Sequence, residues 1–234
     1  MVTPTDPPAS GDDRALHAPS LVTLAVDSIR KQILSDDLKP GERLIEERLT
    51  KDLAISRPPL REALRLLENE GLVVSMPRRG SFVATLTEQD VFEILTLRSA
   101  LERMAFEVGI PVKDPALLEP ARAALQEMYR CADSDDRGAM VQAGYYFHAS
   151  LIKIANHQRL EVIYASVQQQ LLLCMSRNLI KRQHAAEDLH AHADLHRLLL
   201  ELVESGDRAA AIDELTIHLQ RSFEANSPQA SSGD

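Results

Sequence analysis

Apolar residues spaced three and four positions apart predict three helices in the first 70 residues of the chain. The first is expected over 21–34. It cannot continue through Lys39-Pro40-Gly41, because proline lacks the required N–H and glycine favours turns. A second, short helix is expected over 46–53. A third is expected from about residue 56 to Glu70, with Gly71 as its C-terminal stop.

Two short apolar runs follow these helices and are typical of strands, over 72–74 and 81–84. The loop 75–80, which contains proline and glycine, joins them into a hairpin. Three helices followed by a β-hairpin are the layout of a winged helix-turn-helix. We therefore expect such a domain over residues 21–86.

Helical patterns dominate the chain after residue 87, and they are interrupted at prolines, a glycine and polar turn residues. Helices are expected near 88–109, 114–132, 136–155, 158–182, 187–205 and 207–224. Six helices joined by short loops imply an antiparallel bundle, which we place over residues 88–224. The predicted fold class is thus mainly α, with an N-terminal winged helix-turn-helix plus a C-terminal antiparallel helical bundle.

The two ends of the chain lack helical or strand periodicity. Residues 1–20 are rich in Pro, Ser, Asp and Ala, and we expect a disordered leader there and a disordered tail over 226–234. The N-terminal residues have neither the basic region nor the apolar region of a secretion signal, so a cytoplasmic protein is expected.

Composition favours packed helices over an all-β fold, because aromatic residues make up only 4% of the chain and tryptophan is absent. The longest apolar run, 171–175, is far shorter than the ~20 residues that a membrane span needs. Cys131 and Cys174 have no partner spacing that would indicate a disulfide framework or a metal site. We expect both to be core thiols.

The net charge of −9 at first argues against a nucleic-acid partner. However, residues 1–85 hold 12 basic and 13 acidic side chains, so the acidity lies mainly in the C-terminal part. Within 56–82, five arginines outnumber three glutamates. This basic patch coincides with the predicted third helix and hairpin.

Three arginines form a basic stripe along the third helix. Arg57, Arg61 and Arg65 recur every four residues, on a face distinct from the apolar leucines. In a helix-turn-helix this helix lies in the major groove, where a guanidinium can bond bidentately to guanine. We therefore predict DNA binding. The alternative is a solvated face paired with the neighbouring glutamates.

Two neighbouring groups are predicted to contact the DNA backbone. Pro58 and Pro59 lack the N–H groups that an N-cap Ser56 would otherwise accept from, so its hydroxyl is free for a phosphate. In the hairpin loop, Gly80 permits close backbone approach and Arg79 is expected along a phosphate or the minor groove.

The N-terminal part of the sequence resembles the GntR family of regulators. The resemblance covers about residues 20–86 and rests on the segments LKPGERL (38–44), ISRPPLREAL (55–64), EGL (70–72) and RRGSFV (78–83). It implies DNA contacts from Ser56, Arg57, Arg61 and Gly80. The sequence departs from the family at Glu47, where an arginine is frequent.

Three histidines from three different predicted helices lie on apolar faces: His148, His196 and His218. Imidazoles that converge inside a bundle can bind zinc, nickel or another divalent metal, because bundle metal sites are commonly built from facing helices. The alternative is that they are hydrogen-bonded core histidines or lie near the surface.

The C-terminal part resembles the FadR-type ligand-binding domain (FCD domain) of GntR regulators, over about residues 88–224. Phe147-His148, the turn at Asn156, and His196 and His218 placed eleven residues either side of Asp207 carry this resemblance. Many members of that group hold a metal through three histidines and one aspartate.

The family's aspartate position is occupied here by Gly144, four residues before His148. The resemblance thus implies a metal site with three histidines and no protein carboxylate, which leaves positions for water or an effector at lower metal affinity. His192, one turn before His196, is a possible substitute ligand, although a solvated position is the simpler expectation.

Arg98 and Glu102 lie one turn apart within an apolar pattern, so each charge needs a partner if it is buried. One interpretation is an ion pair between them. The other is that Arg98 binds the carboxylate of an effector.

We expect a dimeric, metabolite-responsive transcriptional repressor that binds an inverted-repeat operator and senses a small organic acid. It is not expected to be an enzyme. The alternatives are a metal-free sensor of acyl thioesters and a metal-dependent bundle enzyme. The chain lacks a nucleophile constellation for the latter, and Glu214, near His218, is more simply a solvated residue.

Overall fold

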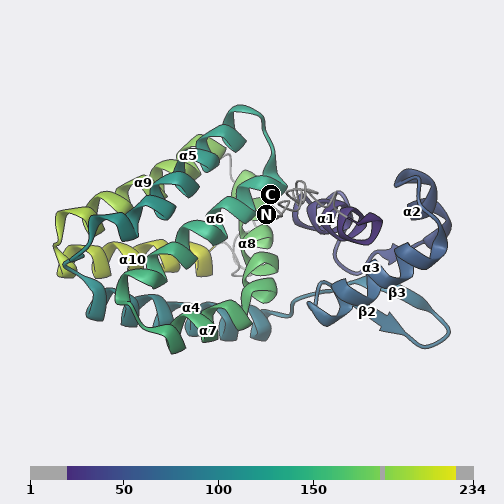
Figure 1. Ribbon diagram of the computed structural model, residues 1–234, viewed down its shortest axis with the longest axis horizontal. Coiled ribbons are helices and arrows are strands. Elements are labelled where there is room, and N and C mark those ends of the chain that lie inside the picture. Colours follow the sequence, from purple (N-terminus) through teal and green to yellow (C-terminus); the bar gives the residue numbers. More distant parts are fainter. Residues whose placement is uncertain (1–19, 185–187, 225–234) are drawn as a thin grey trace, which may run out of the picture.

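The predicted winged helix-turn-helix is present in the computed structural model, which describes residues 20–184 and 188–224. Its elements are α1 (Leu21–Leu34), α2 (Glu46–Asp52), α3 (Arg57–Asn69), β2 (Val73–Met76) and β3 (Gly80–Val83). Their apolar faces share one core, in which Ile29, Leu60 and Leu67 are fully buried. This part lies on the right of Figure 1.

A third strand, which the apolar pattern did not predict, completes the wing. Strand β1 (Arg43–Leu44) pairs antiparallel with β3, and the sheet order is β1-β3-β2. Arg43 lies opposite Phe82. Two residues are too short for an alternating pattern to be recognised, so only the pairing identifies this strand.

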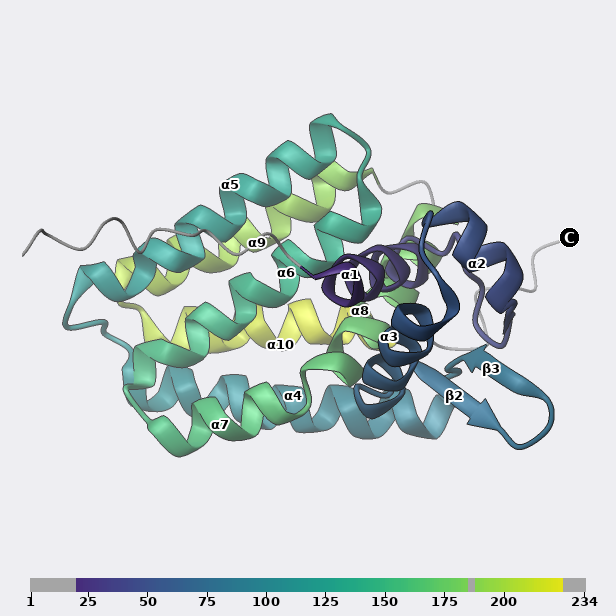
Figure 2. The same cartoon turned by 45° about the vertical axis from the view of Figure 1, so that its right-hand side comes forward.

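The second part is the predicted antiparallel bundle, and Figures 1 and 2 show its long helices side by side. Short 3-10 turns over Pro115–Leu118 and Lys153–Ala155 precede α5 and follow α6. The helices are α4 (Glu88–Gly109), α5 (Glu119–Asp133), α6 (Arg137–Ile152), α7 (Gln158–Ser166), α8 (Gln168–His184), α9 (Leu189–Ser205) and α10 (Arg208–Glu224). The fold class predicted from the sequence is therefore confirmed.

The single helix predicted over 158–182 is wrong, because the chain forms α7 and α8 there instead. At Val167 the backbone leaves the helical conformation, and its N–H donates to Tyr164. Neither glycine nor proline marks this break. Its cause is tertiary, since Tyr164 is anchored in the bundle by a hydrogen bond to Glu102 of α4, while α8 runs on toward α1.

Local capping sets the ends of the bundle helices. Thr87 and Asp90 form a capping box at the start of α4. Gly206, with φ of 77°, ends α9 in the left-handed conformation that glycine adopts without strain. None of the helices in the described residues combines the length and apolar content needed to cross a bilayer.

Helices α1 and α8 join the two parts, and they lie next to each other in both views (Figures 1 and 2). Leu34 of α1 belongs to the core of the bundle, whereas Leu173 of α8 packs against the core of the winged part. The guanidinium of Arg177 donates to the carbonyl oxygen of Leu86, in the segment between β3 and α4. Helix α8 thus holds both the first helix and the linker.

The predicted leader and tail, 1–20 and 226–234, lie outside the described residues except for Ser20, whose side chain caps α1. Both cysteines are buried free thiols, as expected.

Candidate functional site

Helix α3 has the two faces that the sequence predicts. Leu60, Leu64 and the other apolar residues of the helix are buried, while Arg57, Arg61 and Arg65 are exposed. Ser56 is the N-cap, and its side chain makes no capping hydrogen bond. The exposed face therefore carries cations and a hydroxyl that could contact DNA.

The three arginines differ in the partners they have without DNA. Arg61 is paired with Glu46 of α2, and Arg65 is paired with Glu62 on its own helix. Arg57 has no ion-pair partner among the described residues. Both pairs are solvent-exposed, so a phosphate or base can compete with the carboxylate at low cost.

The wing places further basic groups beside α3. Arg78 and Gly80 both have positive φ, 63° and 96°, and they form the tight turn of the hairpin. The Arg79 guanidinium lies 5.9 Å from the centre of the Phe82 ring. The pairing of β1 with β3 adds Arg43, whose Nε lies 3.5 Å from the point that a Cβ on Gly80 would occupy. Arg43 was not predicted from the sequence as a wing residue, because β1 is too short to leave an apolar pattern.

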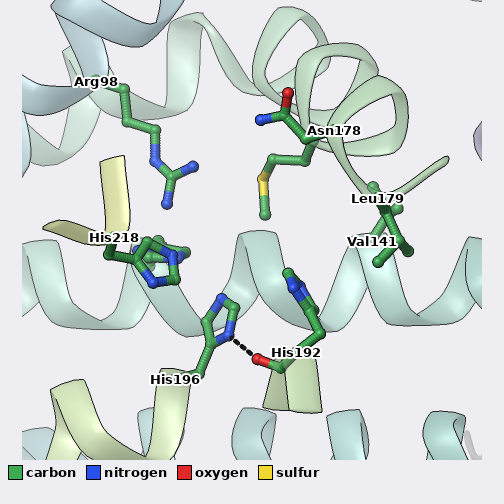
Figure 3. Close-up of a pocket in the computed structure, with 9 residues that line it drawn as sticks. Arg98, Val141, Asn178, Leu179, His192, His196 and His218 are labelled. Carbon is green, nitrogen blue, oxygen red and sulfur yellow. Dashed lines mark hydrogen bonds between the residues drawn. The ribbon is translucent and has the colours of Figure 1, made fainter. Parts of the chain in front are cut away.

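The three predicted histidines converge inside the bundle, and two of them, His196 and His218, are labelled in Figure 3. His148 comes from α6, His196 from α9 and His218 from α10, and their side chains are buried. One ring nitrogen from each lies within 4.8 Å of those of the other two. Three imidazole nitrogens at such separations can be gathered around one divalent ion by small side-chain adjustments.

A carbonyl oxygen lies behind the ring of His196 and a carboxylate lies behind the ring of His148. The Nδ1 of His196 lies 2.9 Å from the carbonyl oxygen of His192, the dashed contact in Figure 3, so Nδ1 carries the proton and Nε2 is left to accept. The Nδ1 of His148 lies 3.3 Å from a carboxylate oxygen of Glu102. A carboxylate or carbonyl behind a metal-binding imidazole is the usual arrangement around metal-binding histidines.

The protonation of the cluster also suits a metal. Burial lowers the pKa of His148, and it lowers the pKa of His196 and His218 well below their ordinary value, so all three rings stay neutral. The Nε2 of His148 is buried and has no hydrogen-bond partner among the described residues. The donor set therefore fits a divalent ion such as zinc or nickel.

No carboxylate lines the pocket next to the triad among the described residues. Gly144 lies one turn before His148, and a Cβ built on it would lie 3.1 Å from the terminal methyl of Met175. Met175 also lines the pocket, so its thioether covers the space beside Gly144.

The buried pair formed by Arg98 and Glu102 adjoins the triad. Arg98 Nε donates to Glu102 at 2.7 Å, and the Tyr164 hydroxyl donates to the same carboxylate oxygen at 2.8 Å. Burial would raise the pKa of Glu102, but Arg98, and after it His148, outweigh burial and lower the pKa to about 2. The ion pair predicted as one of two interpretations is thus present.

This ion pair leaves part of Arg98 available. Its Nη2 is buried and has no hydrogen-bond partner among the described residues. In Figure 3 the guanidinium points toward His218 and His196, and Arg98 lines the same pocket. Tyr164, which fixes the pair from α7, was missed by the sequence analysis because a lone tyrosine carries no motif.

Two polar residues differ from their predicted environments. His192, expected to be solvated, is half-buried and lines the pocket, although it is not one of the three converging ligands. Glu214, also expected to be solvated, is 9% exposed and lies 3.7 Å from Arg221 on the same helix. Glu214 faces the bundle from α10. The sequence did not predict this position, because a charged residue is normally expected at the surface.

Helix α8 lines the pocket through Met175, Asn178 and Leu179, and the last two are labelled in Figure 3. The enclosed space has a volume of about 20 Å³. That volume holds an ion or a single water molecule. A larger ligand must displace lining side chains.

Two family models match this chain. Residues 22–83 match bacterial regulatory proteins of the gntR family, and residues 93–221 match the FCD domain. Both matched segments coincide with the parts whose geometry is described above.

Relatives of similar length share about a quarter of their residues with the chain. It is 29% identical over 215 residues to the uncharacterized HTH-type transcriptional regulator YdhC of Bacillus subtilis, which covers 91% of this chain and 94% of the relative. It is 27% identical over 190 residues to the gluconate operon transcriptional repressor of the same species, covering 80% and 77%.

Two solved structures share the fold. A GntR transcriptional regulator from Rhodococcus sp. RHA1 superposes with a TM-score of 0.68 at 23% identity, covering 87% of this chain and 95% of the other. McbR/YncC of Escherichia coli superposes with a TM-score of 0.67 at 20% identity, covering 92% and 100%.

Proposed function

This chain belongs to the gntR family of bacterial regulatory proteins and carries an FCD domain, and we propose that it senses a small organic acid through a metal in that domain. It is a DNA-binding transcriptional regulator rather than an enzyme. The metal is zinc or nickel, held by His148, His196 and His218. The effector carboxylate binds between this metal and Arg98.

The observation that carries this proposal is that three converging imidazoles lie beside a guanidinium nitrogen that has no hydrogen-bond partner among the described residues. The buried Nη2 of Arg98 lacks a partner, although a buried guanidinium nitrogen normally has one. A carboxylate can satisfy it by a charge-assisted hydrogen bond while its other oxygen faces the histidines. The ring nitrogens bind the metal, and the guanidinium favours an anionic ligand.

The same geometry gives a route from the effector to the DNA-binding part. A ligand larger than the enclosed space of about 20 Å³ must displace Met175 or Asn178, and both belong to α8. The intervening residues, Ser176 and Arg177, bond to α1 and to the linker. Movement of α8 would therefore change the position of α3 through α1 and through the linker over 85–88.

The proposed DNA-binding form is a homodimer in the cytoplasm that places one α3 in each half of an inverted repeat. Helix α7 offers an apolar contact surface for the second protomer, because its adjacent residues Val162 and Ile163 are 64% and 48% exposed. Ser56, Arg57, Arg61, Arg65, Arg79 and Gly80 are the proposed DNA contacts. The relative named for the gluconate operon is a repressor, which supports repression of a metabolic operon as the role of this chain.

The pocket favours this effector class over an acyl thioester. Its lining combines three histidines and an arginine in a space of about 20 Å³, whereas an acyl chain needs a long apolar cavity. A sensor of acyl thioesters would have to open the bundle and cover these polar groups with hydrocarbon.

Metal analysis is the first test. Protein purified without chelator, in buffers that contain acetate, is expected to contain about one equivalent of metal per chain, and His218→Asn is expected to lose it. The control is His190→Gln, which removes an exposed histidine of α9 that bonds to Asp133. Absence of metal in the wild type, together with no rise in unfolding temperature on adding zinc or nickel, would reject the site.

The effector is tested by thermal unfolding with a panel of small carboxylates, with and without metal. Arg98→Ala is unsuitable as the first variant, because it leaves the buried Glu102 unpaired and is expected to cost about 3–5 kcal/mol of stability. Arg98→Lys keeps a positive charge beside Glu102 but loses the guanidinium fork. It should retain metal and lose most of the carboxylate response. An unchanged response would place the effector elsewhere.

A further inference from the structure

The charges around the histidine triad do not balance those of a bound dication. Its three ligands are imidazoles, which bind a metal in their neutral form and therefore bring no negative charge. Arg98 lines the pocket beside the triad, and Glu102 lies 3.3 Å from Nδ1 of His148; both are buried, and their charges neutralise each other. A divalent ion bound here would thus leave two positive charges in the protein interior, beside a guanidinium.

Glu102 is not available to offset this charge. One of its oxygens accepts from Arg98 Nε and from the Tyr164 hydroxyl, and the other faces Nδ1 of His148, on the far side of that ring from Nε2. Moving this carboxylate into the ligand set would leave Arg98 without a counter-ion. Because an uncompensated buried charge is costly, the three imidazoles bind a dication more weakly than a ligand set that includes a carboxylate.

Gly144 is where the protein could have supplied the missing charge. It lies one turn before His148, so a side chain there would project on the same face of α6. Its neighbour in that direction is the flexible end of Met175, not backbone. An acidic side chain fits at this position once the end of Met175 moves aside, and the chain has none there.

We propose that the metal and the effector carboxylate bind this regulator as an obligate pair, with the effector supplying the negative charge that the triad lacks. This inference rests on the proposed function and concerns how the two ligands depend on each other. One carboxylate oxygen completes the metal's ligands, and the other accepts from Arg98 Nη2. Coupling is reciprocal, so metal raises the affinity for the acid as much as the acid raises the affinity for metal.

The consequence is a regulator that responds only when both ligands are present. Metal alone is held weakly, and acid alone meets one guanidinium in a pocket of neutral imidazoles. The proposed movement of α8 then occurs only when a metal ion and a small carboxylate are both bound. A site with its own carboxylate would stay loaded with metal and would sense the acid alone.

The test measures zinc affinity by competition with a chelating dye, in sodium acetate and in sodium nitrate of equal ionic strength. Acetate is a small carboxylate, so it needs to displace the lining side chains less than a larger acid does, and nitrate is a weak ligand for zinc. We expect acetate to tighten zinc binding by roughly tenfold or more in the full-length wild type. Equal zinc affinity in the two salts would overturn the inference while leaving the metal site intact.

Gly144→Asp is the decisive variant, because it places a carboxylate beside the triad. It should bind zinc tightly in nitrate, and acetate should then add less than about threefold. The control is Tyr146→Asp, which adds the same charge to an exposed position of α6 and should keep the wild-type dependence on acetate. A folded Gly144→Asp protein that keeps the full acetate dependence would contradict the inference.

Two further outcomes separate this inference from the proposed function. Failure of zinc to bind in either salt would remove the proposed function itself. Zinc affinity in nitrate that rises with pH until it equals the value in acetate would show that hydroxide supplies the charge, and it would overturn the need for a carboxylate. The wild-type measurement decides between these outcomes even if Gly144→Asp does not fold.

Discussion

The guanidinium Nε of Arg61 lies 3.0 and 3.1 Å from the two carboxylate oxygens of Glu46, so an acid of α2 holds a cation on the exposed face of α3. Hydrogen bonding and the charge of Glu46 raise the pKa of Arg61. The side chain of Arg61 is 66% exposed. Glu46 therefore competes with DNA for Arg61, while the side chain of Arg61 stays exposed.

Removing this competitor should strengthen DNA binding. Glu46→Gln frees Arg61 and removes a negative charge near the phosphates, so affinity for a selected operator duplex is expected to rise a few-fold at low salt, measured by fluorescence anisotropy. Glu107→Gln, which removes the exposed partner of Arg103 in the bundle, is the control. Weaker binding by Glu46→Gln would show that the pair positions Arg61 for DNA.

Loss of the arginines themselves should weaken binding. Arg57→Ala and Arg61→Ala are each expected to reduce operator affinity by roughly tenfold to a hundredfold. Arg103→Ala, on α4, is the control for removal of an exposed arginine. Operator affinity that is unchanged in both α3 variants would rule out α3 as the reading helix.

The contact between α8 and α1 should carry the effector response. Ser176 donates a buried hydrogen bond of 2.7 Å to the carbonyl oxygen of Leu34. Ser176→Ala is expected to cost about 0.5–1.5 kcal/mol of stability and to reduce the change in DNA affinity on adding effector, with zinc binding unaltered. Ser166→Ala removes a bond of the same length that stays within α7, and it should keep the full response.

The sequence could predict the features that depend on local patterns. The two faces of α3, the position of the hairpin and the three histidine-bearing helices all follow from apolar spacing, and the structure confirms them. The break at Val167 could not be predicted, because it depends on Tyr164 reaching Glu102 across 62 positions of sequence. The proximity of Arg98 to the triad likewise depends on contacts between residues that are far apart in the sequence. Neither contact leaves a periodic signal.

Tyr164 should contribute measurably to the rigidity of the site. Tyr164→Phe removes a donor from the buried Glu102 carboxylate and is expected to lower the free energy of unfolding by about 1–3 kcal/mol. The matched control is Tyr146→Phe, since Tyr146 is 57% exposed, and its effect should be close to zero. Urea denaturation at neutral pH measures both, and equal effects would mean that Glu102 does not need this bond.

The buried histidines should make the metal-free protein sensitive to mild acid. Burial lowers the pKa of His148, His196 and His218 below the ordinary value of 6.5 in the folded state. Arg98 acts in the same direction on all three, while Glu102 opposes it at His148. Below that pH the unfolded chain therefore binds more protons than the folded chain, so the free energy of unfolding falls as the pH falls.

Each histidine that stays neutral in the folded state contributes a slope of roughly 1.4 kcal/mol per pH unit. Denaturant titrations of chelator-treated protein through pH 6.5 should thus show a steep loss of stability, and His218→Asn should reduce the slope by about one proton. His190→Gln, which removes an exposed histidine, is the control. Zinc with acetate should shift the loss to lower pH, because bound metal holds the imidazoles unprotonated. A stability that stays flat below pH 6.5 without metal would mean that these rings can take up protons in the folded state, and that the cluster is open to water rather than closed as the structure shows.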